Sequence, residues 1–243
     1  MSFSVSSIRK ILLEHALLEF LPESSLEPLA RFTQKMLDIN QTLNLTKWIQ
    51  VEDVLQNHIL DSAFGLPNLK NLMEPVASSW MDLGTGGGFP GALVVAAFPS
   101  WQTTFVDSVL KKGQAVQQCL NAAGWNFKTL TARAEDLGRN PATRETWDGV
   151  VARAVADLPV LLEYAVPLLK VGGHLVTWMT ENQIKDLNKS ENAFNLLQVK
   201  IIEKKQYHLS GLSQNRWILV MKKFEKTSIQ YPRIVGQPSK KPL

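Results

Sequence analysis

Two acidic residues on either side of a glycine-rich stretch form the combination in this chain that could bind a reactive ligand. Asp82 stands two residues before Gly84, and five glycines fall within the eight residues 84–91. Glycines allow a tight turn and let the backbone approach a ligand closely. Asp107 follows Gly86 by 21 residues, close to the ~20-residue spacing at which an acid binds ribose hydroxyls. The pattern predicts a nucleoside-containing ligand; the alternative for Asp107 is a cap on the next helix.

The acid before the glycines distinguishes between two kinds of cofactor. A dinucleotide would bring its pyrophosphate to the helix that follows the glycines, and the carboxylate of Asp82 would repel that charge. S-adenosylmethionine has no phosphate and carries a positive sulfonium and an ammonium group, which a carboxylate attracts. The sequence therefore favours S-adenosylmethionine, with a simple turn residue as the alternative for Asp82.

Two further clusters follow predicted strands. Arg133, Ala134 and Glu135 come after the strand 128–131, where the backbone of Ala134 and Glu135 could contact an adenine edge; the alternative is a helix start with acids favourably placed against its dipole. Arg153 follows directly after the predicted strand 149–152. It could hold a phosphate or a base in bidentate fashion, or form only a surface ion pair.

The elements that must position these residues alternate along the chain. Three amphipathic helices, 5–20, 26–43 and 52–64, come first and are predicted to cap a sheet. From Trp80 onward, strands alternate with helices, which predicts an α/β fold with a mostly parallel sheet. The expected strands are Trp80–Leu83, Thr103–Val106, Lys128–Thr131, Gly149–Ala152, His174–Met179, Lys200–His208 and Trp217–Lys222, and the expected helices among them are Pro90–Phe98, Leu110–Ala123, Pro159–Leu169 and Asn182–Leu197. Asn68–Ser79 is expected to be a loop.

The last two strands have no long helix between them, so they should form an antiparallel hairpin at the sheet edge. We expect three regions: an N-terminal helical cap, 1–79, which does not fold independently, a ligand-binding domain, 80–224, and a basic tail, 225–243. Residues 222–243 carry a net charge of +5 within a chain total of +4. Such a tail favours an anionic partner such as nucleic acid, or is simply a solvated end.

The remaining composition narrows the class of protein. The 243 residues contain no apolar run of 18, and the N-terminus has no signal-peptide pattern. Cys119 is the only cysteine and falls in an apolar helical stretch, so we expect a core residue in a reducing cytoplasm. The four histidines are scattered and form no metal-ligand spacing. We therefore expect a cytoplasmic protein with no metal and no membrane anchor.

Several segments occur together in one order and spacing: Leu43-Asn44-Leu45-Thr46, His58-Ile59-Leu60-Asp61-Ser62, Asp82 to Gly91, Asp107-Ser108, Arg133-Ala134-Glu135 and Arg153-Ala154. Over about residues 40–243 the chain resembles the glucose-inhibited division protein B family, bacterial methyltransferases that modify a guanine N7 of 16S ribosomal RNA. The ending, residues 231–243, resembles that of many members. Departures are Ala115-Val116, Ala152 and Met179-Thr180, where relatives often carry Phe-Leu, Ser and Lys-Gly.

The resemblance implies a class I methyltransferase fold, Rossmann-like, with a seven-stranded sheet. It also implies that Gly84, Phe89, Ala134, Glu135 and Arg153 contact S-adenosylmethionine, to which the argument from the residues adds Asp82, Gly86 and Asp107. Guanine N7 carries a lone pair and no proton, so we expect positioning and no catalytic base. Phosphate contacts are expected from Arg153 and from Lys111, Lys112, Arg233, Lys240 and Lys241.

The expected partner is 16S ribosomal RNA, alone, in the small subunit or in an assembly intermediate. Three alternatives remain open at this point. They are a class I methyltransferase with another substrate, a nicotinamide-dependent oxidoreductase, and a non-catalytic RNA-binding or assembly factor that keeps a relic pocket.

Overall fold

A computed structural model shows an α/β fold and describes residues 3–72, 78–209 and 214–243. Seven strands form one sheet in the order β3-β2-β1-β4-β5-β7-β6. Their bounds are β1 Ser79–Leu83, β2 Gln102–Asp107, β3 Lys128–Thr131, β4 Trp147–Arg153, β5 Leu169–Thr180, β6 Val199–Tyr207 and β7 Arg216–Lys223. The chain divides into two compact units, the first of Met1–Ala77 with Gly84–Thr131 and the second of Ser78–Leu83 with Ala132–Leu243.

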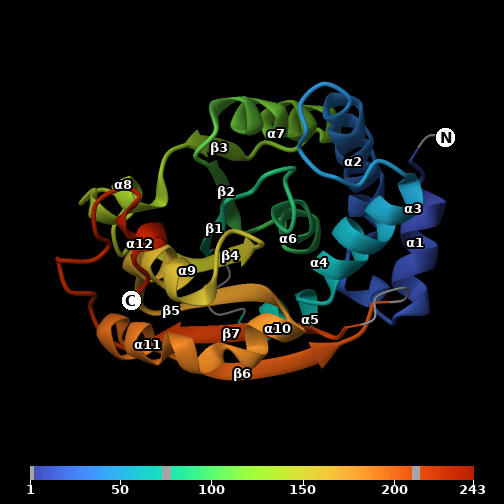
Figure 1. Ribbon diagram of the computed structural model, residues 1–243. Coiled ribbons are helices and arrows are strands. Elements are labelled where there is room, and N and C mark those ends of the chain that lie inside the picture. The colour runs from blue at the N-terminus through green and yellow to red at the C-terminus, as the bar shows by residue number, and fades with distance from the viewer. Residues whose placement is uncertain (1–2, 73–77, 210–213) are drawn as a thin grey trace. The chain divides into compact units, whose positions relative to one another are not determined.

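The first unit contains most of the helices. They are α1 Val5–Glu14, α2 Leu26–Asn40, α3 Val51–Val54, α4 Asp61–Ala63, α5 Leu66–Lys70, α6 Gly91–Ala97 and α7 Leu110–Ala123, with a π-helical turn at Leu55–Leu60. Helix α2 packs against both α6 and α7 (Figure 1). Its apolar stripe of Leu29, Phe32 and Met36 is completely buried, as the 3.6-residue period of these positions predicts.

Strands β2 and β3 of the first unit pair in parallel, from Thr104 opposite Lys128 to Asp107 opposite Thr131. Helix α7 packs against both strands. All seven residues of α6 are buried, which agrees with the unbroken apolar sequence after the glycines. The carboxyl end of β2 therefore presents Asp107 within the same unit as the glycine-rich loop.

The second unit holds the other strands and the helices α8 Ala134–Arg139, α9 Leu158–Ala165, α10 Glu181–Lys185, α11 Glu191–Leu197 and α12 Gln237–Lys240. Strands β1, β4 and β5 run parallel. Strand β7 pairs antiparallel with both β5 and β6, and α11 packs against β6 (Figure 1). The predicted antiparallel hairpin at the sheet edge is confirmed.

All seven predicted strands are present, with ends that differ by a few residues, and Leu110–Ala123 is a helix as predicted. The prediction of one continuous helix over 182–197 was wrong, because a 3-10 turn at Leu187–Ser190 divides this segment into α10 and α11. Asn188 and Ser190 are weak helix formers in that turn. The helix predicted over 5–20 ends at Glu14, and Ala16 has φ +53°.

Residues 68–79 were predicted to be a loop, but α5 extends to Lys70 and β1 begins at Ser79. Residues 73–77 of that segment, and residues 210–213 before β7, lie outside the described residues. In the part of the chain that the structure describes, no helix has both the length and the apolar character needed to cross a membrane.

Candidate functional site

The first unit joins the glycine-rich loop directly to Asp107. The backbone N–H of Gly86 donates to Asp107 Oδ2 at 3.0 Å, and the N–H of Val109 donates to Asp107 Oδ1 at 2.9 Å. The Asp107 side chain is 7% exposed. The carboxylate therefore orders both the glycine loop and the chain that enters α7. The predicted contact of Asp107 with ribose hydroxyls stays a prediction.

Helix α2 packs closely against the glycine loop. Gly88 has φ +94°, and a Cβ placed there would lie 2.4 Å from Cζ of Phe32. Real Cβ atoms do not approach a carbon so closely, and a side chain is also strained at this φ. Gly88 is therefore required by its backbone conformation and by its neighbour together.

An aromatic cluster continues from the loop. Phe89 is buried and contacts Phe32 edge to face, with ring centroids 5.7 Å apart. His58 stacks on the Phe89 ring, with the centroids 5.1 Å apart and an angle of 19° between the ring planes. His58 Nε2 lies 2.8 Å from Thr46 Oγ1. Asn40 Oδ1 in turn accepts hydrogen bonds from the N–H groups of Leu45 and Thr46, at 2.7 and 2.9 Å.

These contacts give a structural role to two segments that the sequence could only associate with a family. Residues 43–46 and 58–62 lie far from the glycines in sequence, but Thr46 and His58 support Phe89 beside the loop. Sequence reasoning assigned no role to Asn40, Thr46 or His58. The recurrence of the two short motifs together was the available signal.

In the second unit, Asp82 and Arg153 lie toward the carboxyl ends of neighbouring parallel strands. Leu83 of β1 is opposite Ala152 of β4 in the register, so Asp82 and Arg153 fall within two positions of each other along that edge. Asp82 is completely buried and Arg153 is half-buried. Thr177 Oγ1 donates to the carbonyl oxygen of Ala152 at 2.8 Å, which fixes the strand just before Arg153.

Ala134 and Glu135 begin helix α8, as the alternative interpretation of this cluster predicted. The Glu135 carboxylate is 1% exposed, and its Oε1 accepts from the N–H of Gly236 at 3.0 Å and from Arg133 at 3.4 Å. The side chain therefore faces the C-terminal tail. The predicted contact of the Ala134 and Glu135 backbone with a ligand stays a prediction.

The predicted RNA-contacting residues fall into two groups. Lys111, Lys240 and Lys241 are exposed and Lys112 is half-buried. Arg233 instead forms a bidentate ion pair with the fully buried Glu163, through Nη2 to Oε2 at 2.5 Å and Nε to Oε1 at 2.9 Å. This hydrogen bonding raises the pKa of Arg233. The guanidinium of Arg233 holds the tail against the second unit.

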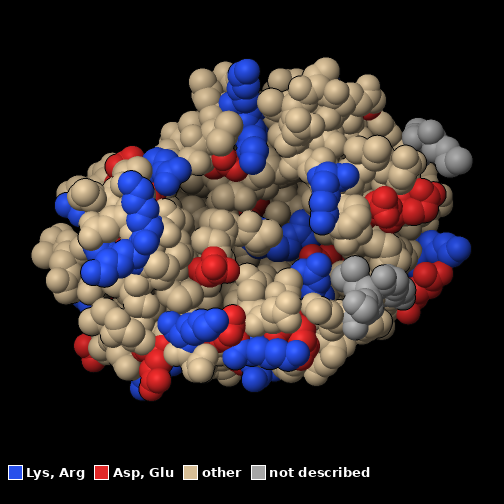
Figure 2. All heavy atoms as spheres, viewed as in Figure 1, with Lys and Arg blue, Asp and Glu red and all other residues tan. Residues whose placement is uncertain are grey.

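Basic side chains on the visible surface form separate groups with acidic residues among them, and one group lies over α8 and α12 (Figure 2). The tail does not extend into solvent, since Thr227, Tyr231 and Pro238 are buried. Charge alone did not distinguish the anchoring arginine from the exposed lysines.

Two other expectations concern reactive side chains. Cys119 is completely buried, as predicted, and burial raises the pKa of its thiol to about 12. Among the residues that the structure describes, no group of three or more His, Cys, Asp or Glu side chains could hold a metal ion.

Comparison with known sequences gives a consistent result. The GidB family model, described as rRNA small subunit methyltransferase G, matches residues 25–216. A protein named Ribosomal RNA small subunit methyltransferase G from Acetivibrio thermocellus is 34% identical over an alignment of 239 residues that covers 97% of each chain. A protein of the same name from Trichormus variabilis is 37% identical, over 88% of this chain and 90% of its own.

Solved structures show the same fold at much lower identity. The YcgJ protein of Bacillus subtilis matches with a TM-score of 0.53 and 14% identity, over 69% of this chain and 100% of its own. A ribosomal protein L11 methylase from Lactobacillus delbrueckii matches with a TM-score of 0.52 and 16% identity, over 69% and 80%. The likeness confirms the predicted class I methyltransferase fold.

Proposed function

Because the chain belongs to the family described as rRNA small subunit methyltransferase G, we propose that it transfers a methyl group from S-adenosylmethionine to N7 of a guanine in 16S ribosomal RNA. The hydrogen bond from the Gly86 N–H to the Asp107 carboxylate is the structural observation that most supports binding of this cofactor. It joins the glycine loop to the acid at the end of the next strand, which is the pair expected to hold a nucleoside.

The residues of the first unit fit an adenosine group. Each oxygen of Asp107 accepts one backbone N–H, and a carboxylate can accept about four hydrogen bonds. Capacity therefore remains for ribose hydroxyls. We assign Gly84, Gly86, Phe89 and Asp107 to the cofactor from this unit.

Considered by itself, the second unit also carries residues that suit S-adenosylmethionine. Asp82 is a buried acid at the end of β1, suited to a positively charged amino acid group, and the backbone of Ala134 and Glu135 is suited to the adenine edge. Arg153 completes the proposed set. The side chain of Glu135 accepts a hydrogen bond from the N–H of Gly236 in the tail, so we assign only its backbone to the adenine.

The cofactor supplies an electrophilic methyl group on a sulfonium sulfur. The residues of the chain need only align the guanine with that group, because N7 loses no proton when it is methylated and no catalytic base is required. Such alignment contributes to rate only if the site is held rigidly. Phe89, packed between Phe32 and His58, gives the glycine loop that rigidity.

The substrate-binding part of the proposal depends on the four lysines, Lys111, Lys112, Lys240 and Lys241. Arg233 would have to leave Glu163 before it could contact a phosphate, so its phosphate role is the weakest of the predicted contacts. The substrate is 16S ribosomal RNA, alone, in the small subunit or in an assembly intermediate. With that substrate, the protein acts in the cytoplasm beside the ribosome.

Transfer of labelled methyl from S-adenosylmethionine tests the proposal most directly. The purified chain would be incubated with 16S RNA, with the small subunit and with an assembly intermediate, and the digested nucleosides analysed. We expect 7-methylguanosine. A different methylated base, or methylation only of protein or small molecules, would overturn the proposed substrate. Binding of NAD in preference to S-adenosylmethionine would overturn the proposed cofactor.

Asp107→Asn tests the cofactor site separately. Loss of charged hydrogen bonds to the ribose should cost about 1.5–3 kcal/mol, which corresponds to a dissociation constant higher by roughly 10- to 150-fold. Asp53→Asn, a half-buried acid in α3 of the same unit, is the matched control. Isothermal titration with S-adenosylmethionine measures both, and equal affinities would remove the ribose role of Asp107.

A further inference from the structure

Helix α8, which begins with the proposed adenine-reading residues, is tied at its first turn to the C-terminal tail, residues 225–243. The N–H of Gly236 donates to Oε1 of Glu135 at 3.0 Å, across 101 positions of sequence. Glu135 is almost completely buried, so this hydrogen bond is shielded from water and strengthened accordingly.

The other end of α8 is held by the same tail. Nη1 of Arg139 donates to the carbonyl oxygen of Pro232 at 3.0 Å. A Cβ on Gly138 would lie 2.8 Å from Cγ of Pro232 and 3.3 Å from Cβ of Pro167. The last turn of α8 is therefore packed tightly between the tail and the 3-10 turn Val166–Leu168.

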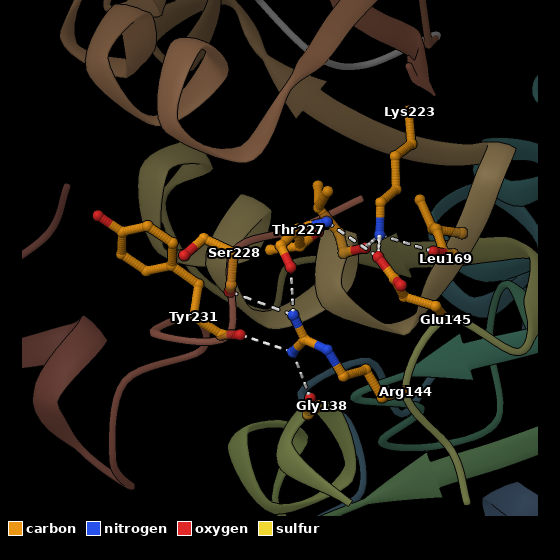
Figure 3. A network of polar contacts seen from close by, with 9 residues as sticks. Gly138, Arg144, Glu145, Leu169, Lys223, Thr227, Ser228 and Tyr231 are labelled. Carbon is orange, nitrogen blue, oxygen red and sulfur yellow. Dashed lines mark hydrogen bonds and ion pairs between the residues drawn. The ribbon is translucent and has the colours of Figure 1, made fainter. Parts of the chain in front are cut away.

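Arg144 joins α8 and the tail through backbone carbonyls alone (Figure 3). Its Nη1 donates to Gly138 at 2.8 Å and to Tyr231 at 2.6 Å, and its Nη2 donates to Thr227 at 2.6 Å and to Ser228 at 3.1 Å. One guanidinium thus connects the C-terminal end of α8 to three tail residues.

One ion pair and two backbone hydrogen bonds fix the tail itself. Arg233 pairs with the buried Glu163 of α9, and its backbone N–H donates to the same carboxylate at 2.7 Å. At the start of the tail, the N–H of Thr227 donates at 2.9 Å to Glu145, which also binds the buried Lys223 at 2.6 Å (Figure 3). Polar contacts therefore dock the tail between Thr227 and Gly236.

A helix of six residues has no stability of its own, so the position of α8 depends on what it contacts. We propose that the docked tail is a positioning element for Ala134 and Glu135, with Arg233 and Glu163 as the pair that sets its register. Through α8 the tail controls the affinity for the adenosine part of S-adenosylmethionine. This inference rests on the proposed function, since it assigns a role relative to that cofactor.

The test uses the full-length chain with Glu163→Gln and Arg233→Met, and with Arg233→Lys as the conservative variant. Dissociation constants for S-adenosylmethionine and S-adenosylhomocysteine should rise about tenfold, and by the same factor because both ligands carry adenosine. The KM for cofactor should rise in parallel while kcat at saturating cofactor stays within twofold. Arg233→Lys should fall between the wild type and Arg233→Met.

Controls separate positioning from general weakening of the fold. Lys226→Ala removes an exposed cation of the same tail, and Lys170→Met removes the ion pair with Asp148 in the same unit. Neither should change the cofactor affinity, whatever it does to the thermal midpoint. Amide hydrogen exchange should accelerate at residues 134–139 in the Arg233 and Glu163 variants and stay unchanged in α11.

Arg139→Met is a milder variant in case the buried pair is needed for folding, because it removes only an exposed side chain that bonds to Pro232. It should raise the dissociation constant two- to fivefold. Variants that melt earlier but bind the cofactor like the wild type would overturn the inference alone. A wild-type chain that binds no S-adenosylmethionine would overturn the proposed function and this inference with it.

Discussion

Gly88→Ala is expected to destabilise the protein far more than an ordinary glycine substitution. Gly88 has φ +94°, and the new Cβ would meet the ring of Phe32 at 2.4 Å. An alanine in the left-handed region costs about 1–2 kcal/mol, and overpacking a well-filled core costs about 1–3 kcal/mol more. The free energy of unfolding should therefore fall by roughly 2–5 kcal/mol, a large part of the 5–15 kcal/mol typical of a domain.

Gly124→Ala supplies the matched control. Gly124 ends α7 with φ +73°, but nothing lies within 4 Å of the point that a Cβ would occupy there. In Gly124→Ala the free energy of unfolding should fall only by the backbone conformational term of about 1–2 kcal/mol. Urea denaturation at equilibrium measures both variants, and an unchanged m-value would show that the same surface is exposed on unfolding.

A double variant isolates the contact itself. Phe32→Leu leaves room for the alanine. The double variant Phe32→Leu/Gly88→Ala should therefore lose about 0.5–3 kcal/mol less of the free energy of unfolding than the sum of the two single variants. Equal losses for Gly88→Ala and Gly124→Ala, or strict additivity with Phe32→Leu, would refute the argument that Phe32 shapes the glycine loop.

Two smaller predictions follow from titratable groups. Burial raises the pKa of Cys119 to about 12, so the native protein should not react with an aromatic disulfide reagent at pH 8, whereas the urea-unfolded chain should react at once; rapid native reaction would contradict its placement in the core. Burial opposes ionisation of Asp148, but hydrogen bonds from Lys170 and Ser79 outweigh it and lower the pKa of the carboxyl. The ionised Asp148 should therefore stabilise the fold above the unfolded-state pKa, and this stabilisation should be lost as the pH falls below about 4. Asp148→Asn should make the free energy of unfolding fall less steeply with pH in that acidic range. An unchanged slope would exclude the contribution of Asp148.

Local patterns in the sequence were sufficient to predict the strands and the position of Asp107 at the end of the strand that follows the glycine loop. Alternating and continuous apolar segments identify strands because burial repeats with the geometry of the backbone. The spacing from Gly86 to Asp107 reflects one strand, one turn and one helix, which have nearly fixed lengths. Such features need no knowledge of distant residues.

Contacts between distant side chains could not be predicted in the same way. Phe32 shapes the loop at Gly88 from 56 positions away, and Gly236 reaches Glu135 across 101 positions. Neither pairing has a local signal, because it depends on how whole elements pack. One partial signal existed at Glu163, a lone acid within the apolar helix predicted over 159–169, since a buried carboxylate needs a cation or hydrogen-bond donors as partners.

The tail shows why net charge alone does not identify the residues that bind a partner. One of its cations, Arg233, is paired with Glu163, while Lys240 and Lys241 remain exposed a few residues later. If those lysines bind RNA phosphates and the docked tail positions α8, both ligands favour the same docked arrangement. Linkage then requires that bound RNA raise the affinity for the cofactor by the same factor by which bound cofactor raises the affinity for RNA. A segment that looked like a solvated basic end would then couple the two substrates of the proposed reaction.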